Sequence, residues 1–197
     1  MWAFELFGTD VYHLIGAFII YSMLGWLLES IYMSLCNRKL TNRGFAKSPF
    51  CPIYGVGAVT GYLILVNFSE NMVGVYFAGA ILATIFEFLV GCGMIRLFGQ
   101  LWWDYNEKPF NYRGIICLES TIAWGFYAIG VVGFLQEKVY QFIDCIDYDM
   151  GIRAIYIILA IVCVDYMFQL AKAFNFDWRE KRDKVMDMVH DFKARWY

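Results

Sequence analysis

Four carboxylic acids interrupt long apolar stretches of this chain and are its strongest candidates for binding chemistry. They are Glu29, Glu87, Glu119 and Asp165, and each stands six to nine residues from a basic residue. With a helical rise of about 1.5 Å per residue, all four acids would lie about 9 to 14 Å deep in the membrane, measured from the same membrane surface. An acid in the bilayer costs on the order of 3 kcal/mol and normally faces a bundle interior or a wet cavity. The four acids therefore predict a polar cavity.

Four clustered carboxylates cannot all stay ionised without a compensating charge, because burial and like-charge repulsion both disfavour the ionised form. The compensation would come from loop arginines, from a bound cation, or from a cationic group on a solute. Glu29 and Glu87 are the primary candidates for binding, and the first choice as ligands if a divalent cation binds. Glu119 and Asp165 are secondary candidates, because they stand nearer the helix ends, where a bond to a neighbouring helix would satisfy them.

The elements that hold these acids are predicted to be membrane-spanning helices. Hydrophobic residues make up 60% of the 197 residues and charged residues only 17%, with a mean hydropathy of +0.52. This is too apolar for a soluble domain, so we expect an all-α integral membrane protein. A span needs about 20 apolar residues. Five stretches fit: Val11 to Cys36, Pro52 to Phe68, Met72 to Phe98, Gly114 to Leu135 and Ile152 to Ala171.

The basic residues predict the orientation of these spans. Of the 16 Lys and Arg residues, 14 fall on alternate connections and in the C-terminal tail. By the positive-inside rule, the N-terminus is then outside and the C-terminus in the cytoplasm. We expect one transmembrane domain over residues 1–171 of a multi-pass plasma-membrane protein. Residues 172–197 would form a cytoplasmic amphipathic helix at the inner leaflet, although a solvated or partner-binding helix fits nearly as well.

A faint internal repeat connects the two primary acids. The segment Leu24–Ile31 can be laid on Leu82–Leu89 so that Glu29 falls on Glu87. Each unit then passes through an element containing Asn, Arg and Gly to a cysteine and a further apolar helix. A parallel repeat of two helices would place a site between its halves. The alternative is chance, because membrane spans draw on few residue types.

Two polar loops, Asn42 to Ala58 and Leu101 to Gly114, are expected to form opposite walls of the cavity. Glycine and proline allow irregular backbone at the membrane face, which is tolerated where it lines a cavity. The alternatives are an interfacial aromatic belt and ordinary turn chemistry. The candidate binding residues are Asn42, Arg43, Cys51, Pro52 and Tyr54 in the first loop, and Trp103, Asp104, Asn111 and Arg113 in the second.

Several kinds of chemistry have no motif in the sequence. The six cysteines are scattered singly and without a nearby histidine, so they suggest neither a zinc site nor a redox pair. The chain has no phosphate-binding loop, nucleophile elbow or zinc-protease motif, so it cannot hydrolyse ATP by itself. No cofactor is identified, and no nucleic-acid partner is expected.

The residues around these loops resemble a known bacterial family. The matching elements are Gly25-Trp26-x-x-Glu29, Asn42-Arg43-Gly44-Phe45, Cys51-Pro52-Ile53-Tyr54, Glu87, Trp103-Asp104-Tyr105, Pro109-Phe110-Asn111 and Gly114 to Leu118 with Ser120, Trp124 and Gly125. Together they resemble the permeases labelled "putative ABC-transporter type IV", or CmpB-like, over roughly Gly25 to Gly125. The resemblance implies transport, and a separate ATPase subunit as a partner.

Three functions fit the sequence. The first is a transport component whose acidic, cytoplasm-facing cavity binds a small cationic or polar solute. The second is a membrane-embedded, metal-dependent enzyme acting on a lipid or isoprenoid headgroup, with carboxylates on the metal and an arginine on phosphate. The third is a structural or regulatory membrane subunit. We favour the first and lean against an enzyme; the bilayer is the expected surrounding, and the oligomeric state is left open.

Overall fold

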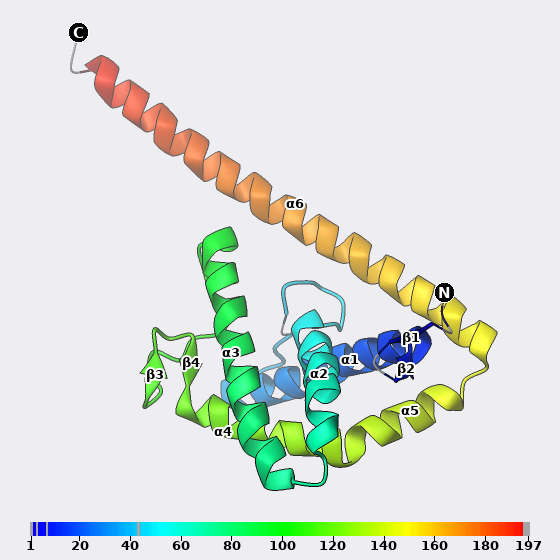
Figure 1. Cartoon of the computed structure of the whole chain (residues 1–197). Coiled ribbons are helices and arrows are strands. Elements are labelled where there is room, and N and C mark those ends of the chain that lie inside the picture. The colour runs from blue at the N-terminus through cyan, green and yellow to red at the C-terminus, as the bar shows by residue number, and fades with distance from the viewer. Residues whose placement is uncertain (1, 3, 7, 43, 195–197) are drawn as a thin grey trace.

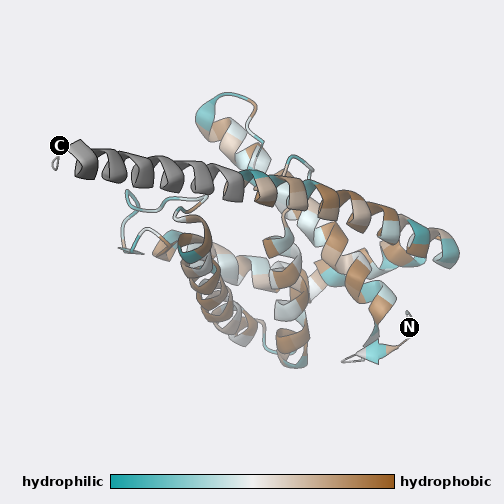
Figure 2. Cartoon of the chain, turned by 90° about the horizontal axis from the view of Figure 1, so that it is seen from above, coloured by the Kyte–Doolittle hydropathy of each residue, from teal (hydrophilic) through white to brown (hydrophobic). Residues whose placement is uncertain are grey.

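The computed structural model describes residues 2, 4–6, 8–42 and 44–194, with side chains described as far as residue 173 except that of Leu6. Helices dominate this part of the chain (Figure 1). Apolar residues make up most of the helical ribbon, and polar residues gather in the connections (Figure 2). Arg43 lies outside the described residues, as does any amphipathic face of the tail.

The chain begins with a short hairpin that leads into the first long helix. Strands β1 (Glu5–Leu6) and β2 (Thr9–Asp10) pair antiparallel. The Asp10 carboxylate then accepts a hydrogen bond from the His13 amide at 2.9 Å and caps α1 (Val11–Asn37). The helix ends where Arg38 adopts the left-handed conformation, with φ of 50°.

The second and third helices form a hairpin. Helix α2 (Pro52–Leu65) starts on a proline, whose missing N–H has no partner to lose at a helix start, and it ends in a 3₁₀ turn at Val66–Phe68. The Asn71 side chain caps α3 (Met72–Phe98) by accepting from the Gly74 amide at 3.0 Å.

A second small hairpin lies between the third and fourth helices. Strands β3 (Asn111–Tyr112) and β4 (Ile116–Cys117) pair antiparallel just before α4 (Leu118–Gly130). A π-helical turn at Val131–Leu135 joins α4 to α5 (Gln136–Asp144). The last helix, α6 (Tyr148–Ala194), lies along the outside of the bundle.

Within the part of the chain that the structure describes, four helices are long and apolar enough to cross a membrane: Val11–Asn37, Met72–Phe98, Leu118–Asp144 and Tyr148–Ala173. The stretch Pro52–Phe68 forms a shorter apolar helix. The predicted helical membrane fold is thus confirmed in its class. The described residues contain four candidate spans, so the predicted count of five is not confirmed.

The bounds of the predicted fourth span were wrong at both ends. Residues before Leu118 pair in the β3–β4 hairpin, so the helix starts four residues after Gly114. It also continues past Leu135, because the π turn carries it into the polar-faced α5. The predicted boundary at residue 171 is not marked by a break, since α6 is one continuous helix.

Glycines allow two helix pairs to pack closely. A Cβ atom at Gly25 would overlap the Tyr54 ring where α1 crosses α2. A Cβ atom at Gly79 would overlap Ala128 where α3 crosses α4. Small residues at crossings are how membrane helices approach one another without a hydrophobic driving force. The bundle is therefore built from an α1–α2 pair and an α3–α4 pair.

Candidate functional site

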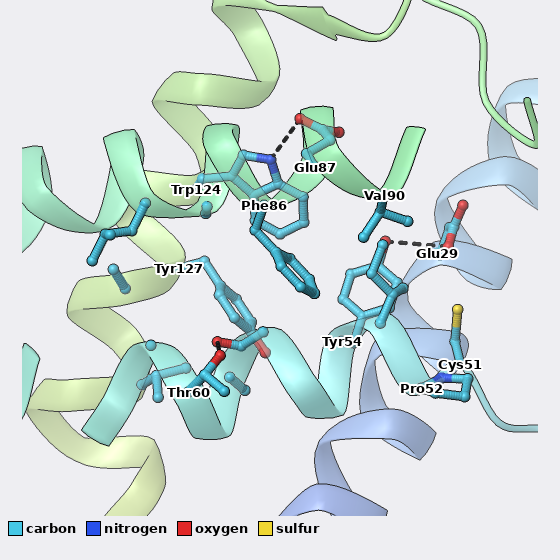
Figure 3. A pocket seen from close by; sticks show the side chains of 18 of the residues that line it. Glu29, Cys51, Pro52, Tyr54, Thr60, Phe86, Glu87, Val90, Trp124 and Tyr127 are labelled. Atoms are coloured by element: carbon cyan, nitrogen blue, oxygen red, sulfur yellow. Dashed lines mark hydrogen bonds between the residues drawn. The ribbon is translucent and has the colours of Figure 1, made fainter. Parts of the chain in front are cut away.

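A cavity of about 530 Å³ lies between α2, α3 and α4, and residues of the two polar loops form part of its lining. This volume is in the usual range for a small-molecule site. Both Glu29 and Glu87 line it, one from each helix pair (Figure 3). The rest of the described lining is mainly aromatic and aliphatic, so the cavity is polar only around these acids and a few hydroxyl groups.

Glu87 is held by hydrogen bonds from three side chains. Its Oε1 accepts from the Tyr105 hydroxyl at 3.0 Å, and its Oε2 accepts from Ser120 Oγ at 3.2 Å and Trp124 Nε1 at 3.0 Å. The residue is 6% exposed. An indole N–H can only donate, so Glu87 must accept there. These bonds tie α3 to α4 and to the loop that carries Tyr105.

Glu29 has a less buried setting than Glu87. Its Oε2 accepts a hydrogen bond from the Tyr54 hydroxyl at 3.1 Å, across the α1–α2 contact that Gly25 makes possible. The Glu29 side chain is partly exposed and lines the cavity. Both carboxylates therefore border the cavity, and Glu87 is the more deeply buried of the two.

The donors of the two acids are neighbours. The Tyr54 and Trp124 rings lie 6.1 Å apart between centroids, with 51° between their planes. Figure 3 shows Glu29 and Tyr54 on one side of the cavity and Glu87 and Trp124 on the other. The acids are thus connected through one aromatic contact.

The two helix pairs use the same local arrangement. In the first, Cys51 precedes α2 and Tyr54, three residues later, donates to the acid of α1. In the second, Cys117 precedes α4 and Ser120, three residues later, donates to the acid of α3. This correspondence matches the sequence alignment of Glu29 with Glu87.

Phe45, in the loop from Gly44 to Cys51, belongs to a cluster of aromatic rings at the cavity. Phe45 stacks on Trp102 with centroids 4.8 Å apart and planes 19° apart, and it also contacts Phe98 and Tyr166. All four rings line the cavity.

Helix α6 fastens this loop. The Tyr166 hydroxyl donates to the Phe50 carbonyl at 3.1 Å, and the Ser48 amide donates to Asp165 Oδ2 at 2.6 Å. The predicted secondary acid Asp165 is therefore a loop anchor and is not part of the cavity lining.

The second loop contributes Trp103 and Tyr105 to the lining. Trp103 Nε1 donates to the Ile115 carbonyl at 2.7 Å, which fixes the loop on the β3–β4 hairpin. Burial, followed by the nearby Glu87 charge, raises the pKa of the Tyr105 hydroxyl above its usual range. Tyr105 therefore stays protonated and donates its hydrogen bond.

Several predicted site residues lie away from the cavity and have local partners. Asp104 accepts from both nitrogens of Asn106, and Asn111 bonds to backbone groups of residues 106, 108 and 114. These are the roles of turn residues, which was the alternative interpretation of this loop. Arg113 lies over the Tyr112 ring at 5.4 Å.

The two remaining predicted residues outside the lining, Asn42 and Glu119, also have hydrogen-bond partners. Asn42 accepts a hydrogen bond from Trp26 Nε1 at 2.7 Å. Glu119 pairs with Lys108 at 2.8 Å on the exposed surface, and this hydrogen bond raises the pKa of the Lys108 amine. The predicted residues that do line the cavity are Glu29, Cys51, Pro52, Tyr54, Glu87 and Trp103.

Sequence reasoning did not assign the three donors of Glu87 to the site, although all three stand among the elements that resemble the family. A buried carboxylate needs hydrogen-bond donors, and Ser120 and Trp124 are four residues apart on one face of α4. That spacing was the available signal. Among the described residues, no group of three or more His, Cys, Asp or Glu side chains is placed to hold a metal ion.

Comparison with known families agrees with the resemblance seen in the sequence. The family model described as "Putative ABC-transporter type IV" matches residues 16–170. The match extends beyond the predicted Gly25–Gly125 segment and includes every described residue that lines the cavity. No curated protein and no solved structure matches the chain.

Proposed function

The chain belongs to the family described as "Putative ABC-transporter type IV", and from this we propose that it is a membrane transport component whose cavity binds a small cationic or polar solute. The observation that carries the proposal is the cavity of about 530 Å³ between the two helix pairs, with one carboxylate from each pair in its lining. Solute sites in transporters built from repeats are expected near the interface of the halves.

We further propose that the chain crosses the plasma membrane five times, with its N-terminus outside. The short helix Pro52–Phe68 would be the second span: its 14 α-helical and three 3₁₀ residues extend about 27 Å, close to the hydrocarbon thickness. The distribution of basic residues supports this orientation. The end of the cavity that the two loops line would then face the cytoplasm.

The repeat is proposed to be a true duplication of a two-helix unit. Its support is the shared arrangement in which a residue three positions after a cysteine donates to the glutamate of the preceding helix. Chance similarity of apolar spans would not by itself reproduce this hydrogen bond in both pairs.

A separate ATPase subunit is the partner that the family name suggests, since the sequence has no nucleotide-binding motif of its own. The enzyme alternative requires a metal held between the acids. It has less support, because the described residues contain no cluster of three candidate ligands.

Two glycine substitutions test whether the cavity holds the solute. Gly61 lines the cavity, and a Cβ atom there would meet nothing within 4 Å, so Gly61→Leu fills space without a clash at Cβ. Gly93 has the same open surroundings but lies outside the lining, so Gly93→Leu is the matched control.

The measurement is mass spectrometry of small molecules taken from a cell extract by the protein in nanodiscs, followed over time. We expect the wild type and Gly93→Leu to retain the same unmodified compounds and Gly61→Leu to lose them. Equal retention by all three would refute the cavity as the binding site. Conversion of a retained compound to a new mass would favour the enzyme.

A further inference from the structure

We infer that the solute is an amphiphile that dissolves in the bilayer, enters the cavity through a gap between α2 and α3, and places its polar head group against the hydroxyls of Tyr62 and Tyr127. The inference rests on the proposed function for the existence of a solute, and it adds the route of entry and the chemical class. The packing of α2 against α3 and the two tyrosine hydroxyls lead to it, and the charge of the solute does not enter.

Two contacts hold α2 against α3, and a gap lies between them. Towards the start of α2, a Cβ atom at Gly57 would lie 3.5 Å from the Phe86 ring, which reaches toward α2 in Figure 3. At the end of α2, the Leu65 side chain would lie 3.4 Å from a Cβ atom at Gly79. Midway, a Cβ atom at Gly61 would meet nothing within 4 Å. The two contacts are eight residues apart in the sequence, so this gap, which we call the window, is at most about 12 Å high.

The cavity reaches the surface of the bundle at the window. Thr60 and Ile64, on either side of Gly61 in the sequence, line the cavity and are also exposed. Gly61 comes nine residues after Pro52, where α2 begins, so the window lies about 14 Å along the proposed second span. This is near the middle of a hydrocarbon core about 30 Å thick. A molecule dissolved in the bilayer can therefore pass from lipid into the cavity without crossing water.

Two hydroxyl groups in the cavity are available to a ligand. Tyr62 and Tyr127 both line it, and neither hydroxyl has a hydrogen-bond partner among the described residues. The hydroxyls of Tyr54, Tyr105 and Tyr166, which also line it, donate to groups of the protein. A tyrosine hydroxyl can both donate and accept, and leaving one unsatisfied away from water is costly. Tyr62 and Tyr127 are therefore the groups that would hold a polar head group.

The remainder of the wall suits an apolar body. On α3, the described lining residues other than Glu87 are all apolar or glycine, and the π turn adds Val131 and Val132. A hydrocarbon chain gains little by moving from lipid to such a wall, because both surroundings are apolar. Hydrogen bonds to the head group must therefore supply the preference for the cavity, and one net hydrogen bond corresponds to about fivefold.

The test compares two molecules that differ only in the head group, hexadecanol and hexadecane, each with a photoreactive diazirine in mid-chain. The protein in nanodiscs is irradiated with each, and labelled residues are identified by mass spectrometry. Labelling of Val131, which lines the cavity and is 3% exposed, is divided by labelling of Ile81, which is 59% exposed and outside the lining. We expect this ratio to be about fivefold higher for the alcohol, and the double variant Tyr62→Phe, Tyr127→Phe to remove the difference.

Two tryptophan substitutions on α2 test the window. Ile64→Trp places a bulky ring at the window, whereas Val56 is also exposed but lies outside the lining, so Val56→Trp is the matched control. Because both positions are exposed, neither substitution should disturb the packing of the bundle. We expect Ile64→Trp to abolish the labelling of Val131 by the alcohol and Val56→Trp to leave it unchanged.

Each contrary outcome has a distinct meaning. Equal ratios for the alcohol and the hydrocarbon would overturn the assignment of the head group to the tyrosines. Labelling of Val131 that survives Ile64→Trp would overturn the window. Labelling confined to lipid-facing positions would overturn the whole inference, but the proposed function would stand if Gly61→Leu still lost compounds that the wild type retains from a cell extract. If Gly61→Leu retained those compounds as well, the proposed function would also be refuted.

Discussion

Replacing Glu87 with leucine should destabilise the protein far more than replacing it with glutamine. Leucine removes an acceptor that receives hydrogen bonds from Tyr105, Ser120 and Trp124. Side-chain hydrogen bonds in membrane proteins contribute about 0.6–1.7 kcal/mol each, so three of them predict a loss of about 2–5 kcal/mol. We expect the loss to fall in the upper part of this range, because the Trp124 indole N–H can only donate and would be left buried without an acceptor.

Glutamine keeps an acceptor at the correct place. Its amide oxygen can accept from Ser120 and Trp124, and the Tyr105 hydroxyl can turn to accept from the amide nitrogen. The three bonds lose the strengthening that a charged acceptor gives, but the cost of burying a carboxylate is also removed. We therefore expect Glu87→Gln to cost about 1 kcal/mol or less.

The assay is the free energy of unfolding in bicelles, measured by steric trapping. Trp124→Phe provides the second arm of a double-mutant cycle, because it removes the donor and keeps an aromatic ring. If the hydrogen bond carries the effect, the cost of Glu87→Leu falls by about 1 kcal/mol in the Trp124→Phe background. Additive costs, or equal losses for the leucine and glutamine variants, would refute this account of Glu87.

Three further predictions concern the topology, the surface pair and the loop that carries Ser48. Cys145 should react with an impermeant thiol reagent in intact cells and Asn106→Cys, in a Cys145→Ser background, should not; the reverse pattern would invert the proposed orientation. Glu119→Gln should leave the unfolding transition unchanged, because its exposed pair with a lysine is screened by solvent; a clear loss of stability would mean that this acid has a partner within the bundle. Asp165→Asn should speed hydrogen exchange at the Ser48 amide, since a neutral acceptor holds it less strongly; an unchanged rate would show that the loop does not depend on this bond.

The sequence predicted the long helices better than the structure between them. The stretches Val11 to Cys36 and Met72 to Phe98 agree with α1 and α3 to within one residue. Their ends are marked by local signals, namely a capping Asp10 or Asn71 and a change from apolar to polar residues. The fourth span was misplaced because the residues from Gly114 to Cys117 are apolar enough for a helix, but Gly114 and Ile115 form a turn, and Ile116 and Cys117 pair with Asn111 and Tyr112.

The candidate site, too, could be predicted only in part from the sequence. Glu29 and Glu87 could be singled out, because an acid in an apolar span is costly and needs a reason. The different surroundings of the two acids could not be predicted, because the donors of Glu87 lie 18 to 37 residues further along the chain. Asp104 and Asn111 were assigned to the cavity because they lie in the second polar loop and in the elements that resemble the family, and the structure gives them turn hydrogen bonds.

The most direct test of the central claim is the reactivity of Cys51 from within the cavity that it lines. In a variant that keeps Cys51 and Cys145 and replaces the other cysteines with serine, the two thiols are treated with a trimethylammonium-ethyl or a sulfonato-ethyl methanethiosulfonate. Modification of each cysteine is measured by mass spectrometry, with Cys145, which is exposed and outside the cavity lining, as the internal reference. We predict that the ratio of the cationic to the anionic reaction rate is at least tenfold higher at Cys51 than at Cys145. Glu29→Gln should remove this difference. An equal preference at both cysteines, or a faster reaction of the anionic reagent at Cys51, would contradict a cavity that selects cations.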